Sequence, residues 1–378
     1  MRLDDDQLVT PCLVLDRSRL ARNAKRFRAQ FADMPVQLRP HLKTVKSIAA
    51  ARMVLPDMAG PATVSTLREA EVFAENGVDN LLYAVGMAPG KLSRASDLIG
   101  QGVKLTVITD NVRMAQQIVA QSLACGHPMP TLIEVDVDGH RAGVPLHDAE
   151  RLLAVAEVLS AGNCLEGVMT HAGGSYELNG ADAIQRCAEA ERHGAVAMAA
   201  ILREHGYACP TVSIGSTPTA FGLSTSEGIT EVRAGVYTFF DLFQAGVGVC
   251  SIEDIAISVL TTVIGHQAER GWIIVDGGWM ALSADRSTAS QALDQGFGLV
   301  CDCDGNVYQD LIVAKANQEH GIITLRSGAQ QTLPDLPVGT RLRILPNHAC
   351  ATAAQHEGYQ VIDEDLQITA FWPRISGW

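Results

Sequence analysis

The sequence predicts an α/β protein with a (β/α)8 TIM barrel followed by a C-terminal β-rich domain. Short apolar runs alternate with amphipathic stretches as far as about residue 250. Eight such runs suit a barrel, whereas a doubly wound sheet more often has about five to seven strands. After about Val249 the apolar runs continue without helical stretches between them, which indicates a separate β-rich domain.

The predicted barrel strands follow a first extended segment, Cys12 to Asp16, and a helix from about Ser18 to Ala32. Amphipathic stretches such as Thr66 to Asn76 and Asp148 to Ser160 predict the helices between them. The eight strands are expected at Val36 to Pro40, Ala62 to Ser65, Leu81 to Val85, Lys104 to Ile108, Leu132 to Val137, Leu165 to Thr170, Val212 to Ile214 and Glu231 to Tyr237.

We expect the barrel to occupy residues 17–249 and the β-rich domain residues 250–378, with residues 1–16 packing against the latter. Turn signals such as Asp276-Gly277-Gly278 separate its apolar runs. These runs lie at Ile255 to His266, Trp272 to Asp276, Leu311 to Ala316, Arg341 to Leu345 and Leu366 to Phe371.

The composition excludes several classes of function. With 378 residues, of which 47% are hydrophobic and 19% charged, the chain can bury a large core. The net charge of −13 argues against nucleic acid or an anionic membrane as the main partner. No apolar run reaches the roughly 18 residues of a membrane span, and Met1 to Asp6 does not resemble a signal peptide. We therefore expect a cytoplasmic protein whose nine scattered cysteines are reduced.

Lys43 follows the first predicted barrel strand, within Arg39-Pro40-His41-Leu42-Lys43-Thr44. Barrel enzymes place their chemistry at the carboxyl ends of the strands. A lysine held away from bulk water there would be a nucleophilic amine able to condense with a carbonyl. The alternative is a solvated lysine at a strand end, which is the commoner case.

Other unusual residues follow later strands. The fifth predicted strand is followed by Gly139-His140-Arg141, and the sixth by His171-Ala172-Gly173-Gly174-Ser175-Tyr176. The seventh is followed by Gly215-Ser216-Thr217-Pro218-Thr219. The last resembles a phosphate cradle, because glycine and hydroxyl residues at such a turn offer N–H and O–H groups to an oxyanion. Alone it is more often just a turn. With Lys43 on the same face it suggests pyridoxal phosphate.

The β-rich domain contains Leu345-Pro346-Asn347-His348-Ala349-Cys350. In an extended chain, residues two apart project to the same face, so His348 and Cys350 can ligate one divalent ion. Two protein ligands are too few for a structural zinc site, which favours a catalytic metal with open positions. The alternative is a core cysteine beside an unrelated histidine.

Six motifs occur in order along the chain: Arg39 to Thr44, Asp138 to Val144, Thr170 to Gly173, Gly215 to Thr219, Asn317 to Gly321 and Pro346 to Cys350. Together they resemble the fold-type III pyridoxal phosphate family of D-threonine aldolases and eukaryotic-type D-serine dehydratases. The resemblance runs nearly end to end, and it implies an alanine-racemase-like barrel, an appended β domain and a homodimer.

The resemblance also implies roles for single residues. Lys43 would be the Schiff-base lysine and general base, Arg141 a partner of the cofactor's phenolic oxygen, and Arg233 the partner of its pyridine nitrogen. A guanidinium cannot readily release its proton, so Arg233 would leave the ring a poorer electron sink. The further cofactor-binding candidates are His171, Tyr176, Gly215, Ser216, Thr217, Thr219 and Tyr237.

His348 and Cys350 match the metal-binding pair of the family's dehydratases, whereas the aldolase branch typically carries aspartate at the position of Cys350. A thiolate suits zinc, although manganese, cobalt or magnesium remain open. Glu319 and His320 would lie beside the metal, with His320 a second catalytic candidate. Their alternative is an exposed turn of the β-rich domain.

The resulting expectation is a dehydratase that converts a D-3-hydroxy amino acid to a 2-oxo acid and ammonia, with the metal assisting departure of the 3-hydroxyl. D-serine, D-threonine and D-threo-3-hydroxyaspartate all remain open as substrates. The first alternative is a D-threonine aldolase that forms glycine and an aldehyde. A racemase has no use for a metal, and a non-catalytic pyridoxal phosphate carrier would lack the second domain.

Overall fold

The structure, a computed structural model, describes residues 2–5 and 7–378. It divides into two compact units, which we call the barrel unit and the β unit. The barrel unit comprises Arg26–Lys46, Val54–Gly235 and Gly377–Trp378, and the β unit comprises the described residues up to Lys25 together with Ser47–Met53 and Val236–Ser376. The domain limits 17–249 and 250–378 stay a prediction, because compactness does not show which segments fold alone.

The barrel unit contains the predicted eight parallel strands. They are hydrogen-bonded in the order β2-β10-β9-β8-β6-β5-β4-β3, and a parallel bridge between His41 and Thr63 joins the two ends of this series. The barrel expected from the alternating pattern is thereby confirmed. The strands are β2 (Gln37–Pro40), β3 (Ala62–Val64), β4 (Asn80–Gly86), β5 (Lys104–Thr109), β6 (Thr131–Asp136), β8 (Leu165–Thr170), β9 (Thr211–Ile214) and β10 (Glu231–Ala234), with a short β7 (Val144–Pro145) beside β6.

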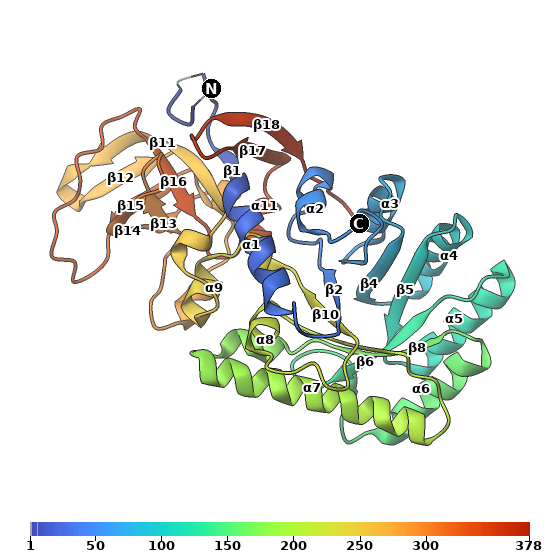
Figure 1. Ribbon diagram of the computed structural model, residues 1–378. Helices are drawn as coiled ribbons and strands as arrows, with labels where there is room; N and C mark the ends of the chain where they lie inside the picture. Colours follow the sequence, from blue (N-terminus) through green and yellow to red (C-terminus); the bar gives the residue numbers. More distant parts are fainter. Residues whose placement is uncertain (1, 6) are drawn as a thin grey trace. The chain divides into compact units, whose positions relative to one another are not determined.

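Helices lie around the outside of these strands, as Figure 1 shows for α3 to α7. Side-chain caps begin several of them. Thr66 accepts from the Glu69 N–H at 3.0 Å, and Asn111 from the Met114 N–H at 3.0 Å. The helices of this unit are α3 (Leu67–Glu75), α4 (Leu92–Gly100), α5 (Val112–Cys125), α6 (Ala149–Ala161), α7 (Ala181–Glu204) and α8 (Thr217–Gly222), with short 3-10 turns at Pro89–Lys91 and Gly173–Glu177.

One cluster of buried apolar side chains comes from four strands that are neighbours in the sheet, β4, β5, β6 and β8. Each strand contributes one side chain, and all four are almost fully buried. Such layers keep a barrel interior solid and leave the chemistry to the loops at the strand ends. The four side chains are Leu82, Ile108, Leu132 and Met169.

The β unit is built on a second nine-stranded sheet of order β12-β15-β14-β13-β16-β11-β1-β17-β18, and an added pairing joins β12 to β11. Apart from the parallel β1–β17 pair, its pairings are antiparallel. The strands are β1 (Cys12–Asp16), β11 (Ile257–Gln267), β12 (Trp272–Val275), β13 (Leu299–Cys301), β14 (Val307–Ala316), β15 (Gly321–Leu325), β16 (Arg341–Leu345), β17 (Gly358–Ile362) and β18 (Ile368–Pro373).

The helices of the β unit are short. They are α9 (Leu242–Val247), α10 (Trp279–Leu282) and α11 (Ala349–Ala353), with 3-10 turns at Val236–Thr238, Ile252–Asp254, Ala268–Arg270 and Ser287–Ser290. The division between the units falls within α1 (Arg17–Gln30) and α2 (Ile48–Val54). Within residues 2–5 and 7–378, no helix is both long and apolar enough to cross a membrane.

Three strands of the β unit, β13, β15 and β17, have no counterpart among the sequence predictions. They have three to five residues and follow turns or loops, so they show too little alternation to be recognised. The predicted strand Glu231 to Tyr237 is also too long. It ends at Ala234, because Val236–Thr238 turns into a 3-10 helix.

Candidate active site

Lys43 lies just beyond the carboxyl end of β2, as predicted, but its side chain is exposed. The expectation that burial would keep it from bulk water is therefore wrong. The charge of Lys43 nevertheless acts on the neighbouring His41. Burial first, and then the positive charges of Lys43 and Arg233, hold the pKa of His41 well below its usual range.

His171 follows β8 and points a ring nitrogen at the next loop. Its Nδ1 lies 3.1 Å from the carbonyl oxygen of Gly215, and because a carbonyl only accepts, Nδ1 carries the hydrogen. Burial lowers the pKa of His171 to about 3, with the hydrogen bond to Gly215 opposing and the charges of Lys43, Arg141 and Arg233 assisting. At neutral pH this imidazole is neutral, and Nε2 is left as an acceptor.

Arg233 is buried at the end of β10. Its Nε donates to the Ser213 hydroxyl at 2.8 Å, and Nη2 donates to the carbonyl oxygen of Thr170. Burial lowers its pKa, while the carboxylates of Glu231 and Glu191 raise it. The guanidinium is thus tied to strands β8 and β9, which fixes its plane inside the barrel.

Arg141 lies in the loop after β6, and its side chain is 54% exposed. Its nearest acidic partner is Glu134, with Nη2 3.6 Å from Oε1. The charges of Arg141, Lys43 and Arg233 all act on the ring of His171. Residues from four strand ends therefore converge at the carboxyl end of the barrel.

The Gly215–Thr219 loop begins α8 with a capping box. The Thr219 N–H donates to Ser216 Oγ at 3.2 Å, and the Ser216 N–H donates to Thr219 Oγ1 at 3.0 Å. Ser216 Oγ also lies 2.8 Å from Ser175 Oγ, which donates to Ala172. The sequence predicted N–H groups free for an oxyanion, but those of Gly215, Ser216 and Thr219 are already engaged within the protein.

Glu191 on α7 is a residue that sequence reasoning missed. Its side chain is fully buried, and Oε1 accepts from the N–H groups of Ala172 and Gly215, both at 3.0 Å. Its other oxygen, Oε2, is buried without a hydrogen-bond partner among the described residues, and burial raises the pKa of the carboxyl group. One carboxylate thus joins the loops after β8 and β9. In the sequence it stands between Glu189 and Arg192 on an amphipathic helix, where nothing marks it as special.

The donor set at this end of the barrel fits an anionic phosphate-bearing cofactor. Three cations, Lys43, Arg141 and Arg233, act together on a neutral His171. The hydroxyl of Thr170 at the end of β8 is buried and has no hydrogen-bond partner among the described residues. An exposed primary amine beside this positive field is also the group needed for condensation with an aldehyde.

His348 and Cys350 lie in the β unit, but not in an extended segment. His348 is the last extended residue, with φ −134° and ψ 107°, and Cys350 is the second residue of α11. The side chains still meet by hydrogen bonding to each other. The predicted extended segment is wrong, although the predicted pairing of the two side chains is present. The chain becomes helical at Ala349, because its N–H donates to Asp241 Oδ2 at 2.9 Å and the stretch that follows is rich in alanine.

Asp285 is the second residue that sequence reasoning missed. Its Oδ2 lies 2.9 Å from Nδ1 of His348, although 63 positions separate the two in the chain. Burial alone would lower the pKa of His348, but the hydrogen bonds to Asp285 and Cys350 raise it to about 11. Since Nδ1 is taken by Asp285, we infer that Nε2 is the nitrogen that contacts the Cys350 thiol.

An imidazole nitrogen and a thiol that share one proton fit a divalent metal, which displaces that proton on binding. The side chain of His348 is 43% exposed, which gives an ion access to the pair. Between residues 7 and 378, and at 2–5, no group of three or more His, Cys, Asp or Glu side chains is arranged to hold a metal. Further ligands would have to be water or substrate.

The remaining predicted residues are placed as follows. Glu319 and His320 are exposed in the hairpin turn between β14 and β15, and the side-chain contacts of His348 go to Asp285 and Cys350 instead. Tyr176 lies near His171, with ring centroids 6.2 Å apart. Tyr237 is buried in the β unit. The predicted roles of Tyr237, Glu319 and His320 stay predictions.

Comparisons with protein families cover most of the chain. "Alanine racemase, N-terminal domain" matches residues 15–242, and "Putative serine dehydratase domain" matches residues 256–362. D-threo-3-hydroxyaspartate dehydratase of Delftia sp. (strain HT23) is 49% identical over 98% of this chain and 98% of its own. D-serine dehydratase of Dictyostelium discoideum is 30% identical over 97% of this chain and 96% of its own.

Solved structures agree with these matches. D-threo-3-hydroxyaspartate dehydratase from Delftia sp. HT23 superposes with a TM-score of 0.95 at 48% identity, over 100% of both chains. A cysteine-to-alanine mutant of a dehydratase of that name, described as being in the metal-free form, also gives 0.95 at 48% identity over 100% of both chains. D-threonine aldolase of Arthrobacter sp. is less similar, 28% identical over 94% of this chain and 90% of its own.

Proposed function

The chain belongs to the alanine-racemase-like family of pyridoxal phosphate enzymes that includes D-threo-3-hydroxyaspartate dehydratase and the D-serine dehydratases, and we propose that it is a dehydratase of D-3-hydroxy amino acids. The resemblance seen in the sequence is confirmed. The proposed products are a 2-oxo acid and ammonia. The observation that carries the proposal is the imidazole–thiol pair of His348 and Cys350 in a chain that matches a dehydratase over its whole length.

We propose that Lys43 binds the cofactor and then moves the proton at the substrate's Cα. Pyridoxal phosphate, when bound, supplies an electron sink for the bond that breaks at this carbon. Lys43 is exposed beside a neutral His171, so its amine is reachable and the neighbouring ring adds no second positive charge. Arg233, a buried donor, favours an unprotonated pyridine nitrogen.

The cofactor phosphate is assigned to the Gly215–Thr219 loop in this proposal. In this proposal the phosphate is held by Thr217, at the start of α8, and by the positive field of Lys43, Arg141 and Arg233. His171, Tyr176 and Tyr237 complete the proposed set.

His348 and Cys350 are the proposed metal ligands, and zinc is the proposed ion, since imidazole and thiolate suit it. A divalent metal supplies a Lewis acid for the departing 3-hydroxyl. The metal-free form reported for a cysteine-to-alanine mutant of a dehydratase 48% identical to this chain supports a metal role. Because the aldolase branch of the family typically carries aspartate at the position of Cys350, the thiolate supports the proposal of a dehydratase.

The test is product analysis with purified protein, pyridoxal phosphate and Zn²⁺. D-threo-3-hydroxyaspartate, D-serine and D-threonine are supplied in turn, and 2-oxo acid plus ammonia is measured against glycine plus aldehyde. Formation of 2-oxo acid from at least one of them is expected. Glycine as the main product from every substrate would instead establish the aldolase alternative.

The resemblance further supports a homodimer, which light scattering at several protein concentrations would measure. A single species of one-chain mass that retains full activity would contradict it.

A further inference from the structure

Three consecutive residues at the proposed metal site are each held by a contact from a distant part of the β unit. Asn347 contacts residues of the 285–296 loop, His348 contacts Asp285 at its start, and the N–H of Ala349 donates to buried Asp241 at 2.9 Å. Because α11 begins at Ala349, these contacts fix the backbone between His348 and Cys350, where the chain changes from extended to helical.

Asn347 is almost fully buried and uses both ends of its amide. Its Nδ2 donates to the carbonyl oxygens of Asp285 at 3.1 Å and Gly296 at 2.6 Å, and its Oδ1 accepts from the Thr288 hydroxyl at 3.0 Å. The side chain next to His348 thus binds the 285–296 loop at its start, middle and end. The backbone of Asp285 cannot shift without breaking a buried hydrogen bond.

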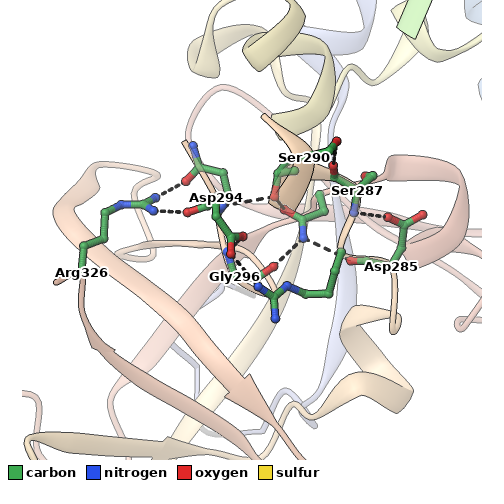
Figure 2. A network of polar contacts seen from close by, with 10 residues as sticks. Asp285, Ser287, Ser290, Asp294, Gly296 and Arg326 are labelled. Atoms are coloured by element: carbon green, nitrogen blue, oxygen red, sulfur yellow. Dashed lines mark hydrogen bonds and ion pairs between the residues drawn. The ribbon is translucent and has the colours of Figure 1, made fainter. Parts of the chain in front are cut away.

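The 285–296 loop is also braced from within, as Figure 2 shows. The Ser287 N–H donates to Asp285 Oδ1 at 2.8 Å, and the Gly296 N–H donates to Asp294 Oδ1 at 2.8 Å. Arg326, just after β15, donates to the carbonyl oxygen of Asp294 and to the Gln295 side chain. Asp285 therefore has one oxygen fixed by its own loop and the other aimed at His348.

We propose that Asp285 is a positioning residue of the metal site, which orients His348 by accepting the Nδ1 hydrogen so that Nε2 faces Cys350 and the metal. This inference rests on the proposed function, and Asp285 acts through His348 rather than as a ligand. A carboxylate behind a ligating imidazole fixes its tautomer and raises its basicity. This role requires that the metal bind Nε2 of His348 and Sγ of Cys350. It excludes Nδ1 of His348 as a metal ligand.

Metal affinity of the full-length protein tests the proposal. Co²⁺ is titrated into metal-free protein, and the cobalt–thiolate absorption of Cys350 is followed. Asp285→Asn should weaken Co²⁺ binding about 10- to 100-fold, since it keeps the shape but removes the charged acceptor. Asp302→Asn is the matched control in the β unit, because its carboxylate accepts from Asn306 in its own turn and does not contact His348 or the 285–296 loop. It should bind within about threefold of the wild type.

Histidine ¹⁵N chemical shifts provide a second measurement that does not depend on affinity. In the wild type loaded with Zn²⁺, His348 should show a protonated Nδ1 and a metal-bound Nε2. Metal bound to Nδ1, or equal Co²⁺ affinity in wild type and folded Asp285→Asn, would overturn the role of Asp285. Absence of Co²⁺ binding by the wild type would refute the proposed metal site itself, which distinguishes the two failures.

Should Asp285→Asn fail to fold, Asp285→Glu replaces it. Its carboxylate is retained on a longer side chain, so binding should be weaker than in the wild type while the thiolate absorption persists. Unchanged affinity in this variant, with unchanged His348 shifts, would likewise overturn the proposal.

Discussion

The two units each depend on one carboxylate that lies far in sequence from what it contacts, but the two carboxylates act differently. Glu191 in the barrel unit is fully buried and binds backbone N–H groups of two loops. Asp285 in the β unit is partly exposed, and besides one N–H of its own loop it binds a single imidazole, that of His348. The first therefore fixes the chain path, whereas the second fixes the orientation of one side chain.

This difference determines how each site should respond to mutation. Loss of a buried carboxylate leaves unpaired backbone donors and affects both stability and cofactor binding. Loss of a partly exposed one leaves the fold intact, because solvent can replace it. The reacting groups themselves should show the largest effects, and they come first below.

Lys43→Ala should abolish both turnover and the visible absorbance of the bound cofactor, because the other lysine that follows β2, Lys46, is paired with Glu69 at 3.0 Å. The absorption spectrum and product assay measure this. Lys104→Ala, an exposed lysine at the amino end of β5, is the matched control and should retain both. Borohydride reduction followed by peptide mapping should label Lys43, and labelling of another lysine would reject the assignment.

Cys350→Ala, or removal of metal by chelation, should lower the elimination rate by roughly three orders of magnitude, the effect of losing a Lewis acid. The cofactor absorbance should persist, because the metal ligands proposed in the β unit do not bind the cofactor. Near-full activity of the chelated enzyme on every D-3-hydroxy amino acid tried would show that the metal has no catalytic role.

Glu191→Gln should weaken pyridoxal phosphate binding about 10-fold and reduce the free energy of unfolding by roughly 1–3 kcal/mol, because two charge-assisted hydrogen bonds become neutral ones. Fluorescence titration and urea unfolding measure the two effects. Glu189→Gln is the control on the same helix. Its carboxylate pairs with Arg192 at 3.0 Å nearer the surface, so it should change stability by less than about 1 kcal/mol.

Local patterns were enough to predict the barrel, since each strand and helix has its own periodicity. The loops carrying Lys43, Arg141, His171 and Gly215 were found for the same reason, because strand ends are visible in sequence. Glu191 and Asp285 were not found, because their partners, Gly215 and His348, lie 24 and 63 positions away in the chain. Long-range pairing leaves no local signal. The helical turn at Cys350 was missed because it depends on Asp241, more than a hundred positions away.

The smallest expected effect concerns pH and tests whether His171 is held neutral. Its folded pKa of about 3 is below the value near 6.5 of an unfolded histidine. Between these values the unfolded chain binds a proton that the folded chain does not, so the free energy of unfolding falls as pH decreases through this window. The slope from His171 should be at most about 1.4 kcal/mol per pH unit. Urea unfolding of cofactor-free protein at about pH 7.5 and about pH 5.5 measures this slope.

His171→Gln should flatten the pH dependence of the free energy of unfolding. His41, whose pKa is lowered as well, keeps part of that dependence in the variant. An equal slope in His171→Gln and the wild type would show that His171 takes up its proton in the folded protein as well.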